Sequence, residues 1–337
     1  MALPSSIRSP KLAGLNKASI GTQGSVNASG KQAPARALDE HADLWCHRKV
    51  PGTGFQQGDG AVKVISLINM KGGVGKTTLA VNIADCLTRQ HGASVLMLDV
   101  DPQFNGTQCL MTPADYVEHR RESKDTMLDL FDRKRVKAST VKGAAEVQPK
   151  TFAEIDLVEV RDNFYLLPGS LDLYRLEMAP GEGRENRLKA FLAALDEEGE
   201  YDYVIIDTPP TPSVWMTSAL IASDYYLIPV KPDPLSLTGL DLLKSIVEDR
   251  KENYGLSVQC AGVVLTMTRS GTNVLADAQR YLSGDIYWKD RVFNTVVPTR
   301  VKYAQQQLNS VFMLDSDADG IGQAIINVTN ELLVRIS

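Results

Sequence analysis

The sequence predicts an α/β fold, with a doubly wound, mostly parallel sheet flanked by helices. Short runs of β-branched and aliphatic residues recur between residues 62 and 297, and amphipathic segments separate most of them. A glycine-rich turn joins the first apolar run to the first helical pattern. Strands that are apolar on both faces are typical of a parallel sheet, because crossover helices cover each face.

The elements follow from two kinds of apolar pattern. Seven segments have the nearly continuous apolar character of buried strands: Val62–Asn69, Ser94–Asp99, Asn163–Leu167, Tyr203–Asp207, Tyr225–Val230, Val258–Thr266 and Val292–Val297. Six segments carry apolar residues at helical spacing: Thr77–Gln90, Arg184–Asp196, Ser213–Ser223, Leu235–Asn253, Asn273–Leu282 and Gly320–Ile336. Because the two kinds alternate to the end of the chain, we expect one α/β domain over residues 61 to 337.

Two regions depart from this alternation. Residues 1 to 60 are rich in Ser, Gly, Ala, Pro and Gln, and up to Arg36 their charged side chains are all basic. Such a segment buries too little apolar surface to offset its ordering entropy, so we expect a disordered basic tail. Residues 111 to 162 contain a helix-like stretch, Asp125–Phe131, and a basic cluster that either ends a solvated helix or contacts a partner or DNA. The cluster is Arg133, Lys134, Arg135 and Lys137.

Composition narrows the function classes. The chain has 337 residues, 43% of them hydrophobic, and a formal net charge of −5. It can bury a large core, and it is not a globally basic nucleic-acid binder, although a local basic face remains compatible with this charge. Its four cysteines form no Cys-x-x-Cys pair and offer no zinc or disulfide framework. No apolar run approaches the roughly 20 residues that span a membrane, so we expect a cytoplasmic protein.

The glycine-rich turn between the first strand and the first helix is the most informative segment. It is Lys71-Gly72-Gly73-Val74-Gly75-Lys76-Thr77-Thr78. Glycines let a backbone wrap closely around phosphate, and the N–H groups at a helix N-terminus point toward its oxygens. We expect Lys76 to reach the β- and γ-phosphates of a nucleotide and the Thr77 hydroxyl to ligate Mg²⁺.

Carboxylates follow two of the predicted strands. Asp99 ends the second strand, with Asp101 two residues later, and Asp207 ends the fourth. α/β folds bind ligands at this C-terminal edge of the sheet. Neighbouring buried carboxylates beside a triphosphate repel each other unless a cation lies between them, so Mg²⁺ is implied, with Thr77, Asp99 and Asp207 as its candidate ligands.

Taken together, these motifs resemble the ParA/MinD family of ATPases, which carries a deviant Walker A motif. Met70 lies where an ordinary P-loop has its first glycine, and Lys71 begins the loop instead. Further stretches also resemble the family: Leu166-Leu167-Pro168-Gly169-Ser170-Leu171-Asp172-Leu173, Ile228-Pro229-Val230-Lys231-Pro232-Asp233-Pro234 and Val297-Pro298-Thr299-Arg300-Val301-Lys302. The pattern is most similar to ParA-type partition ATPases and covers nearly all of residues 62 to 337.

The resemblance implies an ATPase with ATP and Mg²⁺ as cofactors. It implies that Lys71 reaches the nucleotide of the partner subunit across a homodimer, that Lys76 binds the phosphates and that Asp101 orients the attacking water. These three are the implied catalytic residues. Beyond the loop residues 71 to 78, the resemblance assigns Thr266, Arg269 and Pro232 to nucleotide binding.

A cycle of DNA binding is also implied by the resemblance. ATP closes the homodimer, which then binds DNA without sequence preference, and a ParB-like or adaptor protein stimulates hydrolysis. The DNA-binding candidates are Arg269, Arg291, Arg300 and Lys302. The tail is too short and too polar for the helix-turn-helix domain of autoregulatory relatives, so operator-specific repression is not expected. Plasmid partition, chromosome segregation and a nucleoid-associated location are the implied setting.

Two other functions are weighed against this interpretation. A MinD-like ATPase that cycles on membranes needs a C-terminal amphipathic helix with a basic face, whereas residues 321 to 336 have core-type spacing and Arg335 as their one cation. A non-catalytic ATP-sensing assembly protein has no need of Asp101. Phe104 keeps that alternative open, because it replaces the glycine that the family carries after Asp-Pro-Gln.

Overall fold

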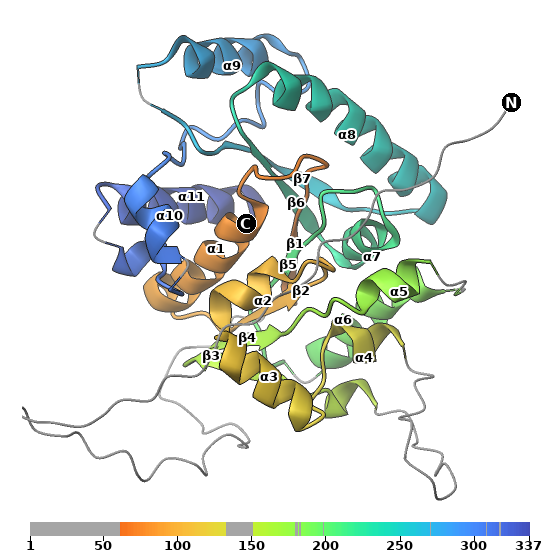
Figure 1. Ribbon diagram of the computed structural model, residues 1–337. Helices are drawn as coiled ribbons and strands as arrows, with labels where there is room; N and C mark the ends of the chain where they lie inside the picture. The colour runs from red at the N-terminus through yellow and green to blue at the C-terminus, as the bar shows by residue number, and fades with distance from the viewer. Residues whose placement is uncertain are drawn as a thin grey trace, which may run out of the picture. The chain divides into compact units, whose positions relative to one another are not determined.

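The computed structural model describes residues 61–132, 151–178, 181, 183–197, 199–269, 271–307, 309–316 and 318–337. The expected N-terminal tail and the basic cluster at 133 to 137 lie outside these residues. The described part contains a sheet of seven strands with the order β3-β4-β2-β5-β1-β6-β7 (Figure 1). This order confirms the predicted doubly wound α/β fold.

The sheet is parallel except at one edge. Its parallel strands are β1 (Lys63–Leu67), β2 (Val95–Asp99), β4 (Phe164–Leu167), β5 (Tyr203–Asp207), β6 (Tyr225–Val230) and β7 (Gln259–Leu265). The edge strand β3 (Val158–Arg161) pairs antiparallel with β4. In the central β2–β5 pair, Asp99 lies opposite Asp207. The register therefore places two predicted site residues side by side.

The helices cover both faces of this sheet (Figure 1). They are α1 (Lys76–His91), α2 (Asn105–Leu110), α3 (Pro113–Arg121), α4 (Met127–Phe131), α5 (Leu173–Glu177), α6 (Arg187–Asp196), α7 (Val214–Ala222), α8 (Pro234–Tyr254), α9 (Asn273–Gly284), α10 (Val301–Gln307) and α11 (Ile321–Ile336). The described residues also form the short 3-10 turns η1 (Phe152–Glu154), η2 (Arg184–Asn186) and η3 (Met313–Asp315).

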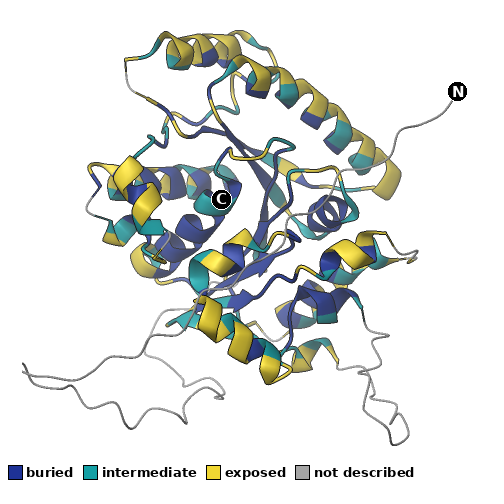
Figure 2. Cartoon of the chain, viewed as in Figure 1, coloured by how far each residue is buried: buried dark blue, intermediate teal, exposed yellow. Residues whose placement is uncertain are grey.

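Alternating strand residues divide the core between the two faces. In β2, Val95 and Met97 pack with α1 and α11, whereas Leu96 and Leu98 pack with α4, α6 and α7. A third cluster joins α7, α8 and α9 to β6 and β7. The strands are buried along most of their length, while α3, α8 and α9 present exposed outer faces (Figure 2). The strands from β1 to β7 other than the edge strand β3 are thus largely buried, as their apolar sequences predict.

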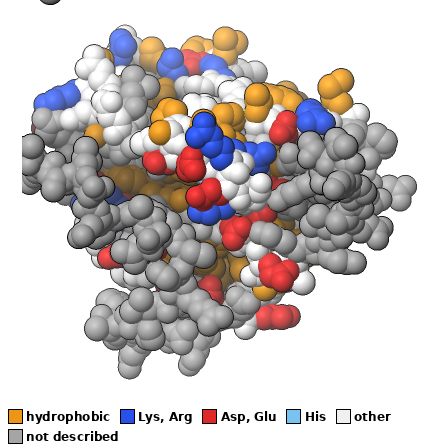
Figure 3. Space-filling model, turned by 60° about the horizontal axis from the view of Figure 1, so that its bottom comes forward, with side chains coloured by type: hydrophobic (Ala, Val, Ile, Leu, Met, Phe, Trp, Pro, Cys, Tyr) orange, Lys and Arg blue, Asp and Glu red, His pale blue; other side chains and the backbone are white. Residues whose placement is uncertain are grey.

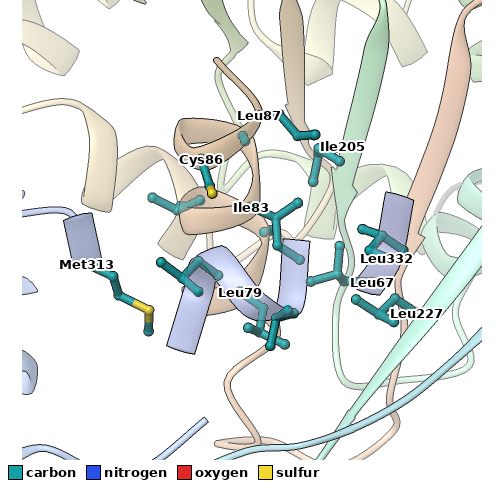
Figure 4. Packing of buried hydrophobic residues seen from close by; sticks show 14 of the residues in the cluster. Leu67, Leu79, Ile83, Cys86, Leu87, Ile205, Leu227, Met313 and Leu332 are labelled. Carbon is teal, nitrogen blue, oxygen red and sulfur yellow. The ribbon is translucent and has the colours of Figure 1, made fainter. Parts of the chain in front are cut away.

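The C-terminal helix α11 belongs to this core. Leu332 packs with Leu67 and Leu227 from the strands, in the same cluster as Leu79 and Ile83 of α1 (Figure 4). Val328 and Leu332 are fully buried. The core-docking interpretation of this helix is therefore confirmed. Among the described helices, none is long and apolar enough to cross a membrane.

One predicted strand is wrong. Residues 292 to 297 run beside β7 and form separate contacts, such as the Val297 N–H donating to the Leu265 carbonyl at 2.8 Å, without a continuous ladder. The N–H groups of Asn294 and Thr295 donate instead to the Glu331 carboxylate of α11, at 2.8 and 3.1 Å. A side-chain acceptor from a distant helix therefore replaces strand pairing, and the local sequence contains no sign of it.

Other differences concern short elements. The structure adds the edge strand β3 and the helices α2, α3, α5 and α10, which the sequence patterns did not predict, and the predicted helix from Arg184 begins as the 3-10 turn η2. Helices of five to nine residues hold too few turns for a recognisable apolar period. Longer helices have clear ends: α8 begins after the capping side chain of Asp233 and ends at Tyr254, where Gly255 takes the left-handed conformation.

Candidate nucleotide site

The glycine-rich loop connects β1 to α1 and has the wrapped backbone that its sequence predicts. Gly73 and Gly75 have φ angles of 69° and 84°, in the left-handed region where a side chain is strained. The Thr266 hydroxyl, at the end of β7, donates to the Val74 carbonyl at 2.6 Å. The residue that follows the edge strand β7 therefore holds the loop in the shape of an anion cradle.

The N-terminus of α1 is open toward this cradle. Gly75 caps the helix without a side-chain hydrogen bond, and its first turn contains no acidic residue. The N–H groups of this turn and the helix dipole together favour an anion at this position. A phosphate group is the ligand that this geometry suits best.

Lys76 is a buried cation beside the loop. Its side chain is only 7% exposed, and Nζ lies 3.4 Å from the Lys71 carbonyl oxygen. Burial lowers the pKa of Lys76, while the charges of Asp207 and Asp101 raise it. The structure thus brings Lys76 together with both carboxylates, and an anionic ligand would further favour its charged form.

Asp99 and Asp207 form a fully buried carboxylate pair at the ends of β2 and β5. The Thr77 hydroxyl donates to Asp207 Oδ2 at 2.7 Å. The N–H and hydroxyl of Thr107 donate to Asp99 Oδ2 at 2.7 and 2.8 Å. The other oxygen of each carboxylate, Oδ1, is buried without a hydrogen-bond partner. Thr107 is a site residue that the sequence motifs did not indicate.

The protonation equilibria of this pair reflect its environment. Burial raises the pKa of Asp99 well above its usual range, and the charge of Asp207 raises it further. Burial also raises the pKa of Asp207 to about 7, although the hydrogen bond from Thr77 and the charge of Lys76 lower it. Two buried carboxylates without a cation between them are a costly arrangement.

These residues fit a divalent cation. The two orphaned carboxylate oxygens and the Thr77 hydroxyl are hard oxygen donors of the kind that Mg²⁺ prefers. No group of three or more His, Cys, Asp or Glu side chains in the described part of the chain could hold a metal by itself. Mg²⁺ commonly binds through one or two carboxylates and completes its shell with water and phosphate oxygens.

Asp101 lies close to this pair, in the turn that follows β2. It is 4% exposed, and its Oδ1 accepts a hydrogen bond from the Gln103 N–H at 2.9 Å. Burial raises its pKa, whereas the Gln103 hydrogen bond and the Lys76 charge lower it. The carboxylate is therefore held in one orientation beside a buried cation.

Phe104 adopts a backbone conformation that normally suits glycine. Its φ angle is 43°, in the left-handed region, which costs a side chain about 1 to 3 kcal/mol. Its ring stacks on Tyr116 with centroids 5.3 Å apart, a contact worth about 0.5 to 1.5 kcal/mol. The Tyr116 hydroxyl donates to the Gly169 carbonyl at 3.1 Å. Packing within its own chain therefore holds Phe104 in place.

Lys71 is bound within its own chain. Its Nζ donates to Asp233 Oδ1 at 2.7 Å and to Ser236 Oγ at 2.9 Å, at the start of α8. Partial burial alone would raise the pKa of Asp233, but the hydrogen bonds from Lys71 and Ser236 lower it below its usual value. The Lys71 side chain is 36% exposed, so this ion pair lies at the edge of solvent.

The residues assigned to the rest of the nucleotide are only partly assembled. Thr266 is buried against the loop and Pro232 is buried, whereas Arg269 is exposed. Met267 was not predicted to belong here. Its Cε lies 3.8 Å from the position that a Cβ on Gly75 would take, and its φ angle is 52°. Its position between Thr266 and Thr268 offered no signal that it contacts the loop.

The DNA-binding candidates lie in different local settings. Arg291 donates to the Tyr287 carbonyl at 2.6 Å and stacks on the Tyr287 ring. Arg300 donates to the Asp319 carbonyl at 2.7 Å, while Lys302 and Arg269 are exposed. On the face shown in Figure 3, lysine and arginine side chains lie interspersed with acidic ones. Both charge signs therefore occur among the described residues that this view shows.

The fold and this site define the class of the protein. A parallel α/β sheet, a glycine loop at a helix N-terminus, a buried loop lysine and carboxylates at adjacent strand ends together characterise a P-loop nucleotide-binding protein.

Comparison with known proteins agrees with this class and narrows it. A family model described as an AAA domain matches residues 62–259. The sporulation initiation inhibitor protein Soj of Bacillus subtilis is 32% identical over 250 residues, which cover 72% of this chain and 87% of that protein. The chromosome partitioning protein ParA of Caulobacter vibrioides is 27% identical over 278 residues, which cover 81% of this chain and 95% of that protein.

A solved structure shares the fold. It is a plasmid partition protein of Borrelia burgdorferi bound to AMPPNP, with a TM-score of 0.63 and 22% identity, covering 82% of this chain and all of that one. The chain therefore belongs to the ParA/Soj family of partition ATPases.

Proposed function

We propose that the protein is a ParA-type ATPase that dimerises with ATP bound and binds DNA without sequence preference in that state. A partner protein, ParB-like or an adaptor, then stimulates hydrolysis, and the cycle positions or segregates a DNA or protein cargo. The names of the relatives support a role in partition: the Caulobacter protein is a chromosome partitioning protein and the Borrelia protein a plasmid partition protein. The proposed location is the nucleoid in the cytoplasm.

The observation that carries this proposal is the buried carboxylate pair beside the phosphate loop. Asp99 and Asp207 each retain an oxygen without a partner, and Thr77 connects Asp207 to the loop helix. ATP with Mg²⁺ would supply a cation for these oxygens and phosphates for the loop. Bound Mg²⁺ would neutralise charge on the phosphate oxygens, with Thr77, Asp99 and Asp207 holding it.

The remaining site residues have separate roles in hydrolysis. Lys76 donates hydrogen bonds to the terminal phosphates and stabilises the charge that develops on them. Asp101 is held beside Lys76 by the Gln103 N–H, and its carboxylate orients the attacking water. We infer slow turnover without the partner, since an added stabilising charge, such as an arginine finger, is worth about 10³ to 10⁵ in rate.

Lys71 is the residue that couples this site to dimerisation. In the single chain it is bound to Asp233 and Ser236, so it must leave both before it can contact phosphates of the partner subunit. An ion pair at this exposure is worth at most about 1 kcal/mol. Charge-assisted hydrogen bonds to a triphosphate are roughly twice as strong as neutral ones and offset that loss.

DNA binding is proposed for the basic side chains that follow β7. Arg269 and Lys302 are exposed, whereas Arg291 and Arg300 must first rearrange or bind through their remaining donors. A dimer doubles the number of phosphate contacts. Affinity should then fall steeply with salt, by about 0.9 in logarithmic slope for each phosphate contact.

The proposal is tested by measuring DNA binding with ATP, with ADP and without nucleotide. We expect binding to unrelated DNA sequences only with ATP, and loss of binding at high salt. Lys71→Ala should abolish ATP-dependent dimerisation and DNA binding. Lys189→Ala, which removes an exposed lysine of α6, is the matched control and should leave both intact. ATP-dependent dimers that bind no DNA under any condition would contradict the partition function.

A further inference from the structure

The phosphate loop is linked to the surface helix α10 through one side chain. Gln307, the last residue of α10, lies beside Thr78 of the loop helix: its Nε2 is 3.2 Å from Thr78 Oγ1, and its Oε1 is 3.4 Å from the same hydroxyl. The Nε2 group also lies 3.5 Å from Cys109 Sγ in α2. Gln307 thus contacts the helix that follows the phosphate loop and the helix that follows Asp101.

A second, buried contact fixes α10 one turn earlier. The Nδ2 group of Asn82 in α1 lies 2.8 Å from the Tyr303 hydroxyl and also donates to the Thr78 carbonyl at 2.7 Å. The Asn82 oxygen accepts from the Met313 N–H at 2.6 Å. Asn82 is 1% exposed and Tyr303 5% exposed, so both the nitrogen and the oxygen of this amide have hydrogen-bond partners in a buried environment.

The segment that leads into α10 is tied to the other side of the phosphate loop. The Thr299 N–H donates to the Thr268 carbonyl at 2.8 Å, and two residues before Thr268, just after β7, the Thr266 hydroxyl donates to the Val74 carbonyl. Residues 297 to 307 therefore contact the segment that holds the phosphate loop at one end and the helix that follows the loop at the other. Between those ends, Val301 and Lys302 are exposed.

A bound phosphate would select one arrangement of this link. The Thr78 hydroxyl has a single proton, and it can donate that proton to Gln307 Oε1 or to another acceptor. A phosphate oxygen can only accept. Once Thr78 donates to phosphate, the contact with Gln307 persists only as donation from the Gln307 Nε2 group, so the amide is held in one orientation.

We propose that Gln307 is a positioning residue that couples occupancy of the phosphate loop to α10, so that the nucleotide state controls how α10 presents Lys302. The inference rests on the proposed function and adds the route by which the nucleotide site acts on the proposed DNA-binding surface. Without nucleotide, both Gln307 arrangements are available and α10 is held less firmly. With nucleotide, one arrangement remains and α10 is fixed on α1.

Amide hydrogen exchange tests the link without DNA. We expect saturating ATP to slow exchange of the α10 amides by about tenfold in the unaltered protein, within the usual range of coupling between sites. Gln307→Met keeps the length of the side chain but removes its hydrogen bonds with Thr78 and Cys109, so this slowing should disappear although ATP still binds. The control Gln305→Met, on the exposed side of the same helix, should retain it.

DNA binding supplies a second measurement. The ratio of DNA dissociation constants with ADP and with ATP should be about tenfold or more in the unaltered protein and in Gln305→Met, and several-fold smaller in Gln307→Met, which still dimerises but no longer fixes Lys302. If Gln307→Met does not fold, Tyr303→Phe replaces it, because it removes only the hydroxyl contact with Asn82.

The two failures are distinguishable. A ratio of one in the unaltered protein contradicts the proposed function, whereas normal slowing of exchange in folded Gln307→Met overturns the coupling role.

Discussion

Buried carboxylates lie at two places along α1, and their surroundings differ. Near its start, Asp99 and Asp207 accept hydrogen bonds only from hydroxyl and amide groups and each retain an unpartnered oxygen. Farther along, Asp85 accepts from Arg161 at 2.6 Å and lies 3.5 Å from Arg89.

That difference separates a structural charge from a functional one. A buried carboxylate that is paired with cations from its own chain needs nothing more, and Arg89 is further held by Asp315 at 2.7 Å. A carboxylate pair with orphaned oxygens beside a phosphate loop is complete only when a ligand brings a cation. Three predictions test this contrast, from the largest expected effect to the smallest.

The largest effect should come from Asp207→Asn. We expect ATP turnover to fall by about 10² to 10³, because the variant loses the proposed cation ligand and with it the proposed electrostatic stabilisation of the phosphates. The unfolding free energy without nucleotide should rise, since a repulsive buried charge has been removed. Steady-state turnover and thermal unfolding measure the two effects, and a variant that is both inactive and less stable would contradict our interpretation of this pair.

The second prediction concerns pH. The folded-state pKa of Asp207, about 7, exceeds its ordinary value, so the folded protein binds more protons than the unfolded chain between about pH 4 and pH 7. Stability without nucleotide should therefore fall as pH rises through this window, by an amount on the order of a few kcal/mol. Asp85, whose pKa is about 6, adds to this loss of stability in the lower part of the same pH window. Denaturant unfolding at several pH values should show a shallower slope in Asp207→Asn, and an unchanged slope would contradict this assignment.

The smallest effect is expected at the paired site. Arg161→Met should lower the unfolding free energy at pH 8 by about 1 to 3 kcal/mol, because Asp85 loses its nearest cation while apolar contact with Phe312 is retained. The loss should be smaller at pH 5, where Asp85 is mostly protonated. ATP turnover per folded molecule should stay near its original value. A loss of turnover with full stability would place this cluster in the functional site after all.

Much of the fold and part of the site could be predicted because their signals are local. Six of the seven predicted strands and all six predicted helices are present, since each carries its own apolar period. Short elements such as α10 escaped prediction because one or two turns carry no clear period. The predicted strand at 292–297 failed because Glu331, far along the chain, takes the N–H groups that a ladder would use.

The site shows the same division between local and distant signals. The phosphate loop, Lys76, Thr77 and the strand-end carboxylates are contained in short motifs, because glycines and strand ends set their geometry locally. The contacts of Lys71 with Asp233, of Asp99 with Thr107 and of Phe104 with Tyr116 follow no spacing rule.

By itself, the sequence determined that this chain builds a P-loop sheet with acidic residues at its ligand edge. Only the tertiary structure decided which of those acids remain unsatisfied and how Gln307 reaches Thr78, 229 residues away. The reason is physical: backbone conformation and apolar period depend on neighbours in the chain, whereas burial and hydrogen-bond partners depend on which distant segments pack together.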